Sequence, residues 1–135
     1  MFSLPLRIYW EDTDAGGVVY HAQYVAFLER ARSEWMRRHG FGQGDLRERF
    51  GIVFAVRAME VDFRGPARLD DAVEVTARLA IARGASAVFA QAVLRDGVEL
   101  VTARVRVASL DAATFRPRAI PDDLHALLAA QVEPD

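Results

Sequence analysis

The feature that most limits the possible folds is a single long amphipathic helix that is followed mainly by strand patterns. Over residues 22–39, apolar residues recur at helical spacing and form one face. These residues are Tyr24, Phe27, Leu28, Ala31 and Trp35. Arginines gather in the last turn and Gly40 follows, which is a common way for a helix to end. We therefore predict a helix roughly 27 Å long, which is enough to cross a sheet.

Strand patterns lie on both sides of this helix. One apolar segment, residues 4–11, precedes it, and residues 52–63, 72–82, 86–95 and 98–110 follow it. Asp96-Gly97 is a strong signal for a two-residue hairpin turn between the last two strands. A strand, one long helix and a run of antiparallel strands are typical of an α+β fold with the helix on one face of a curled sheet.

Side-chain alternation predicts which residues of these strands face the core. In the segment 72–82, we expect Val73, Val75, Ala77, Leu79 and Ile81 to point one way. In the segment 98–110, the matching set is Val101, Ala103, Val105 and Val107. The connector 41–51 is expected to hold a short helix at 44–50, and Pro121 is expected to start a C-terminal helix.

Residues 9–24 combine carboxylates, paired glycines, tyrosines and a histidine just where the helix begins. The run Asp12-Thr13-Asp14 favours a turn, because short polar side chains bond their own backbone. Gly16-Gly17 permits positive φ and a close approach to the backbone. The first N–H groups of a helix suit an anion or a polarised carbonyl oxygen. A carboxylate beside such donors is the minimum set of groups for acyl transfer, and histidine is a common acid or base near neutral pH.

Two other interpretations of this stretch stay open on the local pattern. Asp-x-Asp before Gly-Gly is also common in purely structural turns. Asp12, Asp14 and His21 are all of metal-ligand type, although hard cations usually need more oxygen ligands and no second His or Cys cluster is present. We therefore expect no metal and no cofactor.

Composition excludes several classes of protein. The 135 residues carry a net charge of −2, which argues against a nucleic-acid partner held by overall positive charge. The absence of cysteine excludes disulfides, thiolate zinc sites and cysteine nucleophiles. No apolar run approaches the roughly 20 residues of a membrane span, and the N-terminal apolar segment is too short for a signal peptide. We expect a single domain over residues 1–135 in the cytoplasm.

The stretch from Glu11 to Tyr24 resembles the signature of the 4-hydroxybenzoyl-CoA thioesterase family of hotdog-fold enzymes. It is most similar to the tol–pal-associated acyl-CoA thioesterase subgroup. The similarity continues through residues 27–32, 66–71 and 115–121. The resemblance implies a hotdog fold, in which a long central helix packs on a curled antiparallel β-sheet. It also implies hydrolysis of an acyl-CoA, with short acyl chains expected, to a free acid and CoA.

The resemblance assigns expected roles to residues of this sequence. Asp14 matches the catalytic carboxylate, which acts as nucleophile or as general base for water. The backbone N–H of His21 is implied to polarise the thioester carbonyl, and its side chain to assist. Gly17 and Tyr20 match pocket-forming positions, and Asp12 is expected to support the loop.

The substrate and the fold also suggest partners. Arginine binds phosphate bidentately, and the candidates for the CoA phosphates are the arginines in or beside loops: Arg64, Arg68, Arg83, Arg116 and Arg118. We prefer Arg83 with Ser86, because the glycine turn between them exposes backbone donors. The resemblance implies a homodimer or homotetramer with the active site at the dimer interface, and an acyl carrier protein is a further candidate partner. The alternative function is a non-hydrolytic module of the same fold that binds acyl-CoA or an acyl carrier protein.

Overall fold

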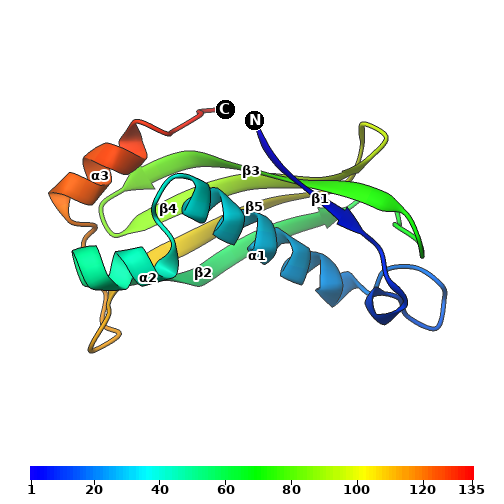
Figure 1. Cartoon of the computed structure of the whole chain (residues 1–135), viewed down its shortest axis with the longest axis horizontal. Helices are drawn as coiled ribbons and strands as arrows, with labels where there is room; N and C mark the ends of the chain where they lie inside the picture. The colour runs from blue at the N-terminus through cyan, green and yellow to red at the C-terminus, as the bar shows by residue number, and fades with distance from the viewer.

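A five-stranded antiparallel sheet curls around one long helix in the computed structural model, which describes residues 1–135 (Figure 1). The strands are β1 (Phe2–Arg7), β2 (Ile52–Phe63), β3 (Ala72–Arg83), β4 (Ser86–Arg95) and β5 (Val98–Asp111). The helices are α1 (His21–Arg38), α2 (Gln43–Asp45) and α3 (Asp122–Ala129), with a 3-10 turn η1 at Trp10–Asp12 and a π turn η2 at Leu46–Phe50. The α+β hotdog arrangement predicted from the sequence is confirmed.

The predicted apolar face of α1 packs against the sheet. All five of its residues, Tyr24, Phe27, Leu28, Ala31 and Trp35, are buried. The ring of Trp35 meets Phe89 of β4 edge-on, with the ring centroids 5.3 Å apart. The chain contains no helix with the length and apolar character needed to cross a membrane.

The strand order β1-β3-β4-β5-β2 makes β2 an edge strand that pairs only with β5. Residues directly opposite each other in an antiparallel pair lie on the same face of the sheet. The β2 residues opposite the α1-facing side of β5 are Phe54, Val56, Met59, Val61 and Phe63. All five are apolar, yet Val56 is 50% exposed and Phe63 is 48% exposed. We call this set the β2 apolar strip.

The first strand differs from the prediction over residues 4–11. It ends at Arg7, and Trp10–Asp12 forms the 3-10 turn η1, which leaves Trp10 83% exposed. The cause is a local hydrogen bond from the Tyr9 N–H to the Asp12 carboxylate, at 2.8 Å, which bends the chain out of the sheet. The strand propensity of the residues before Asp12 was not sufficient to keep the chain extended against this bond.

The alternation predicted for β3 is wrong at its end. Val73, Val75, Ala77 and Leu79 are buried as expected, but Ile81 is exposed and Ala80 is buried. The pairing with β4 shifts register between Leu79 and Ile81. A β-bulge inserts one extra residue and so reverses the side-chain alternation beyond it. The alternation predicted for β5 is confirmed.

Candidate active site

Asp14 opens a tight turn in the loop between η1 and α1. Its N–H donates to the Val18 carbonyl at 2.9 Å, and the Gly17 N–H donates to the Asp14 carbonyl at 3.0 Å. The Gly16 N–H donates to Oδ1 of the Asp14 carboxylate at 2.8 Å. Gly17 has φ +80°, a conformation that glycine adopts without a Cβ clash. The carboxylate is therefore exposed and oriented through Oδ1, while Oδ2 has no protein partner.

Asp12 ties this loop to the start of α1. It is only 5% exposed, and its carboxylate accepts hydrogen bonds from the Tyr9 N–H at 2.8 Å and the Gln23 side-chain amide at 2.9 Å. Its carbonyl accepts the Tyr20 N–H at 3.0 Å. The Asp12 side chain thus supports the loop, and the chain holds no group of three acidic, histidine or cysteine side chains close enough to bind a metal.

Removing the Asp12 carboxylate should destabilise the protein. We expect Asp12→Ala to lower the free energy of unfolding by about 2–4 kcal/mol, because two buried or half-buried donors lose a charged acceptor. Urea denaturation followed by tryptophan fluorescence measures the change. Asp14→Ala is the matched control, because it removes an exposed carboxylate with one donor. Equal losses for the two variants would contradict the anchoring role of Asp12.

The start of α1 presents free backbone donors beside this loop. His21 is the first helical residue, and the Gln23 N–H already donates to the Tyr20 carbonyl at 2.8 Å. The N–H groups of His21 and Ala22 have no acceptor in the chain, and both residues are exposed. Such N–H groups carry the partial positive charge of the helix N-terminus. They can therefore bind an oxygen that gains negative charge.

A surface cleft of about 280 Å³ lies at this helix start. Its lining residues are Val19, His21, Tyr24, Phe63, Arg64, Gly65 and Pro66. The His21 ring lies between Tyr20, at a centroid distance of 4.5 Å, and the edge of Phe63, at 6.4 Å. Aromatic side chains therefore surround the helix start on two sides.

The segment after β2 forms one wall of this cleft and is held by buried polar groups. The Ala67 N–H donates to the Tyr24 hydroxyl, and the Val19 N–H donates to the Ala67 carbonyl, both at 2.9 Å. Burial raises the pKa of the Tyr24 hydroxyl, which therefore stays protonated. Arg95 donates to the Asp71 carboxylate at 2.7 Å, and the Arg68 N–H and Arg95 together lower the pKa of that carboxyl. The wall is therefore held by contacts between residues that are distant in the sequence.

The predicted site residues fall into two groups. Asp14, Gly17, Tyr20 and His21 lie together in the loop and at the start of α1. Arg83 and Ser86 lie at the turn between β3 and β4, at the other end of the sheet. Arg7, the last residue of β1 before the Asp14 loop, pairs with Ala72 of β3. Arg83 lies 11 residues farther along β3, which is roughly 36 Å from that end of the sheet. Within one chain, these two residues are too far from Asp14 to share one acyl-CoA with it in a compact pose.

Phe63 and Tyr24 were not predicted as site residues, whereas Arg64 was one of the loop arginines considered for the CoA phosphates. The sequence places Pro66 only in a stretch that is similar to the family, and Tyr24 in such a stretch and on the apolar helix face. A polar hydroxyl on an otherwise apolar face was the available signal for Tyr24, since buried tyrosines usually bond a partner.

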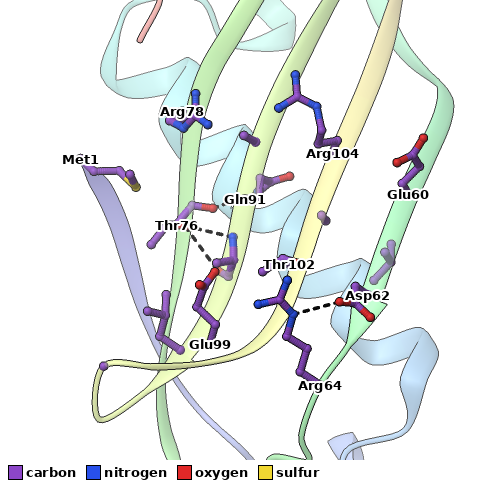
Figure 2. A pocket seen from close by; sticks show the side chains of 16 residues that line it. Met1, Glu60, Asp62, Arg64, Thr76, Arg78, Gln91, Glu99, Thr102 and Arg104 are labelled. Carbon is purple, nitrogen blue, oxygen red and sulfur yellow. Dashed lines mark hydrogen bonds and ion pairs between the residues drawn. The ribbon is translucent and has the colours of Figure 1, made fainter. Parts of the chain in front are cut away.

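A second, larger cleft of about 860 Å³ lies on the face of the sheet away from α1 (Figure 2). Arg78 and Arg104 project into it from β3 and β5. Both pair with the carboxylate of Asp135, Arg104 at 3.0 Å. Because both guanidinium groups already pair with this one carboxylate, the cleft does not provide two unpaired cations for a substrate.

Comparison with known proteins places this geometry in a family. The model of the thioesterase-like superfamily matches residues 8–128. The acyl-CoA thioester hydrolase YbgC of Escherichia coli O6:H1 is 47% identical over 126 residues, which are 92% of each chain. The acyl-CoA thioesterase YbgC of Haemophilus influenzae is 42% identical over 93% of this chain and 92% of its own.

A solved structure gives the same result. The crystal structure of a probable thioesterase from Bartonella henselae is 36% identical, with a TM-score of 0.83, and covers 89% of this chain and 98% of its own. The match over nearly the whole chain confirms the family expected from residues 11–24. The chain belongs to the thioesterase-like superfamily of hotdog-fold proteins.

Proposed function

We propose that this protein is an acyl-CoA thioesterase that hydrolyses a short-chain acyl-CoA to the free acid and CoA. The observations that carry the proposal are the exposed Asp14 carboxylate, bonded by the Gly16 N–H in the loop that leads into α1, and the two unbonded N–H groups at the start of that helix. The names of the relatives from E. coli and H. influenzae support this reaction class.

Asp14 carries the chemistry through its Oδ2 oxygen, because Oδ1 is occupied by the Gly16 N–H. As a nucleophile, it would attack the thioester carbon, release the CoA thiolate and form a mixed anhydride that water hydrolyses. As a general base, it would take a proton from water as the water attacks. In both routes the carbonyl oxygen gains negative charge and binds the His21 N–H.

The His21 imidazole and the loop residues complete the pocket. The imidazole lies between Tyr20 and Phe63, where it can hydrogen-bond the thioester or shuttle a proton. Gly17 and Tyr20 lie in the loop before α1, where they would contact the acyl-CoA from the loop side. The site uses no metal and no cofactor.

The active protein is a homo-oligomer, a dimer or a tetramer of hotdog domains that each span residues 1–135. β2 is an unpaired edge with a half-exposed apolar strip, a surface that pairing with a second copy would cover. Since Arg83 and Ser86 are distant from Asp14 in one chain, they would contact the CoA phosphates of a site in another protomer. An acyl carrier protein is a second candidate carrier of the acyl group, and the expected location is the cytoplasm.

The Asp14 turn should be sensitive to a single methyl group at Gly16. A Cβ at Gly16 would lie 3.1 Å from Oδ1 of Asp14, closer than most Cβ contacts, so Gly16→Ala must displace the carboxylate. We expect kcat to fall roughly tenfold or more, since small displacements of a reacting group have large effects. Ala126→Ser, at an exposed position of α3 that does not line the cleft, is the control. Equal kcat values for both variants and wild type would contradict the placement of Asp14.

The reaction class is tested with a panel of acyl-CoA thioesters. Short aliphatic, long aliphatic and aromatic thioesters are incubated with the protein, and the released thiol is measured. We expect the highest kcat/KM for short aliphatic chains. Failure to hydrolyse any thioester would overturn the proposed activity.

A further inference from the structure

A cavity of about 580 Å³ lies between the C-terminal half of α1, the α2–η2 connector and β2. Its floor is apolar and includes Phe54, Phe89 and Val107. Its lining also includes the half-buried Ser33 and three exposed acids, Glu29, Asp45 and Glu48. A cavity with an apolar floor suits a small organic group.

Arg32 is the one deeply buried charge that lines this cavity. It is 7% exposed, and Nη1 donates to the Gln91 side-chain oxygen at 3.0 Å. The Gln91 amide is itself held by the carbonyls of Leu28 at 3.0 Å and Thr76 at 3.2 Å. This Gln91 bond is the only hydrogen bond of Arg32, although a guanidinium has five N–H groups.

The positive charge of Arg32 is not compensated inside the protein. No carboxylate lies within ion-pair distance of it, since it makes no salt bridge in the chain. Burial lowers the pKa of Arg32, and the exposed Glu29 offsets this only in part. The nitrogens of Arg32 that lack a protein partner are not sealed from solvent, since Ser109 Oγ is the only buried side-chain polar atom without a hydrogen bond. The remaining donors of Arg32 are therefore suited to a carboxylate from outside the chain.

Within one protomer, this cavity is remote from Asp14. Arg32 follows His21 by 11 residues along α1, or roughly 16 Å. A short acyl group that is bound at the His21 N–H therefore cannot reach Arg32 of the same protomer.

Pairing of two copies through β2 brings the two regions together. The Gln43 side chain bonds both the N–H and the carbonyl of Phe54, at 3.3 and 3.0 Å, so the open edge of β2 begins after Phe54. If two copies pair antiparallel through this open edge, the Val56 end of one meets the Phe63 end of the other. Val56 lines the cavity and Phe63 lines the cleft at His21. The cavity of each protomer would then continue from the Asp14 site of its partner.

We propose that Arg32 is a specificity-determining residue that binds a carboxylate at the far end of the acyl group, so that the enzyme accepts ω-carboxyacyl-CoA thioesters. This inference rests on the proposed function and on pairing through β2. The apolar floor holds the methylene carbons, and the Arg32 fork binds the terminal carboxylate.

Pentanoyl-CoA and glutaryl-CoA test the proposal, because both have five acyl carbons and only glutaryl-CoA has a terminal carboxylate. Rates are corrected for hydrolysis without enzyme. For wild type, we expect kcat/KM for glutaryl-CoA to equal or exceed that for pentanoyl-CoA. Arg32→Met should lower the glutaryl-to-pentanoyl ratio roughly tenfold or more, as expected for a lost hydrogen bond to a charged group. Arg30→Met, on the exposed face of α1, should leave the ratio unchanged.

The possible outcomes separate this inference from the proposed function. Wild type that hydrolyses pentanoyl-CoA but rejects glutaryl-CoA overturns the role of Arg32 and leaves the thioesterase intact. An unchanged glutaryl-to-pentanoyl ratio in Arg32→Met likewise overturns the role of Arg32 and leaves the thioesterase intact. If Arg32→Met fails to fold, Arg32→Lys keeps the charge but loses the fork, and a reduced ratio in that variant supports the proposal while an unchanged one opposes it. If no thioester is hydrolysed, the proposed function fails. Calorimetry of glutarate and pentanoate binding then tests the cavity: tighter binding of glutarate supports the role of Arg32, and equal binding opposes it.

Discussion

Asp14→Asn should reduce kcat for acyl-CoA hydrolysis by roughly a thousandfold while the fold and the oligomer persist. Asparagine keeps the side-chain oxygen that accepts the Gly16 N–H, so the turn has the same hydrogen bonds. It lacks the negative charge that attacks the thioester or takes a proton from water. The loss should therefore appear in kcat, with little change in the binding of acyl-CoA.

Three measurements make this experiment decisive. Thiol release gives kcat and KM for the preferred thioester, light scattering gives the oligomer, and calorimetry gives the affinity for a non-hydrolysable acyl-CoA analogue. Asp122→Asn, at the exposed start of α3, is the matched control. Near-normal turnover in Asp14→Asn would refute the catalytic assignment. Acyl-CoA binding without turnover in wild type would instead favour a non-hydrolytic binding module.

Val61→Lys should separate the oligomer into monomers and remove most of the activity. Val61 belongs to the β2 apolar strip and is only half-buried, so a lysine can reach solvent in the monomer. In a β2–β2 interface it would bury an unpaired charge, which costs about 3–5 kcal/mol and raises the dissociation constant more than a hundredfold. Activity should fall with the oligomer if, as proposed, each site takes part of its surface from the second copy.

Light scattering and kcat/KM are measured on the same samples at micromolar concentration. Val98→Lys is the matched control, because Val98 is exposed at the start of β5 and lies outside the strip. We expect it to keep both the oligomer and the activity. A wild-type monomer, or a fully active Val61→Lys monomer, would contradict a site that is shared between protomers.

The elements bounded by glycine, proline or turn residues were predicted best. The ranges predicted for β2 and β4 match the structure to the residue, because Gly51 precedes β2, Pro66 follows it soon after, and Gly84 and Asp96-Gly97 flank β4. The helix was predicted one residue late at both ends, and its buried face was correct. These features depend on residues that are neighbours in the chain.

The errors arose where one contact changed the local geometry. The Asp12–Tyr9 bond ended the first strand early, and the bulge near Ala80 turned Ile81 outward. Arg32 lies at helical spacing from Leu28 and Trp35, on the apolar face of the helix, but arginine is a residue type that is mostly exposed. Its burial follows from Gln91, which is 59 residues away.

The sequence by itself determined the fold class, the helix face and the stretch in which Asp14 precedes the helix start, because these depend on periodicity, turn residues and backbone groups within a few positions. Only the tertiary structure decided that Oδ1 of Asp14 is occupied, that Phe63 and Tyr24 border the site, and that Arg32 is buried in a cavity. It also placed Arg83 at the end of the sheet opposite Asp14. These relations join residues from separate strands and helices, and the register of the sheet and the packing of α1 set them.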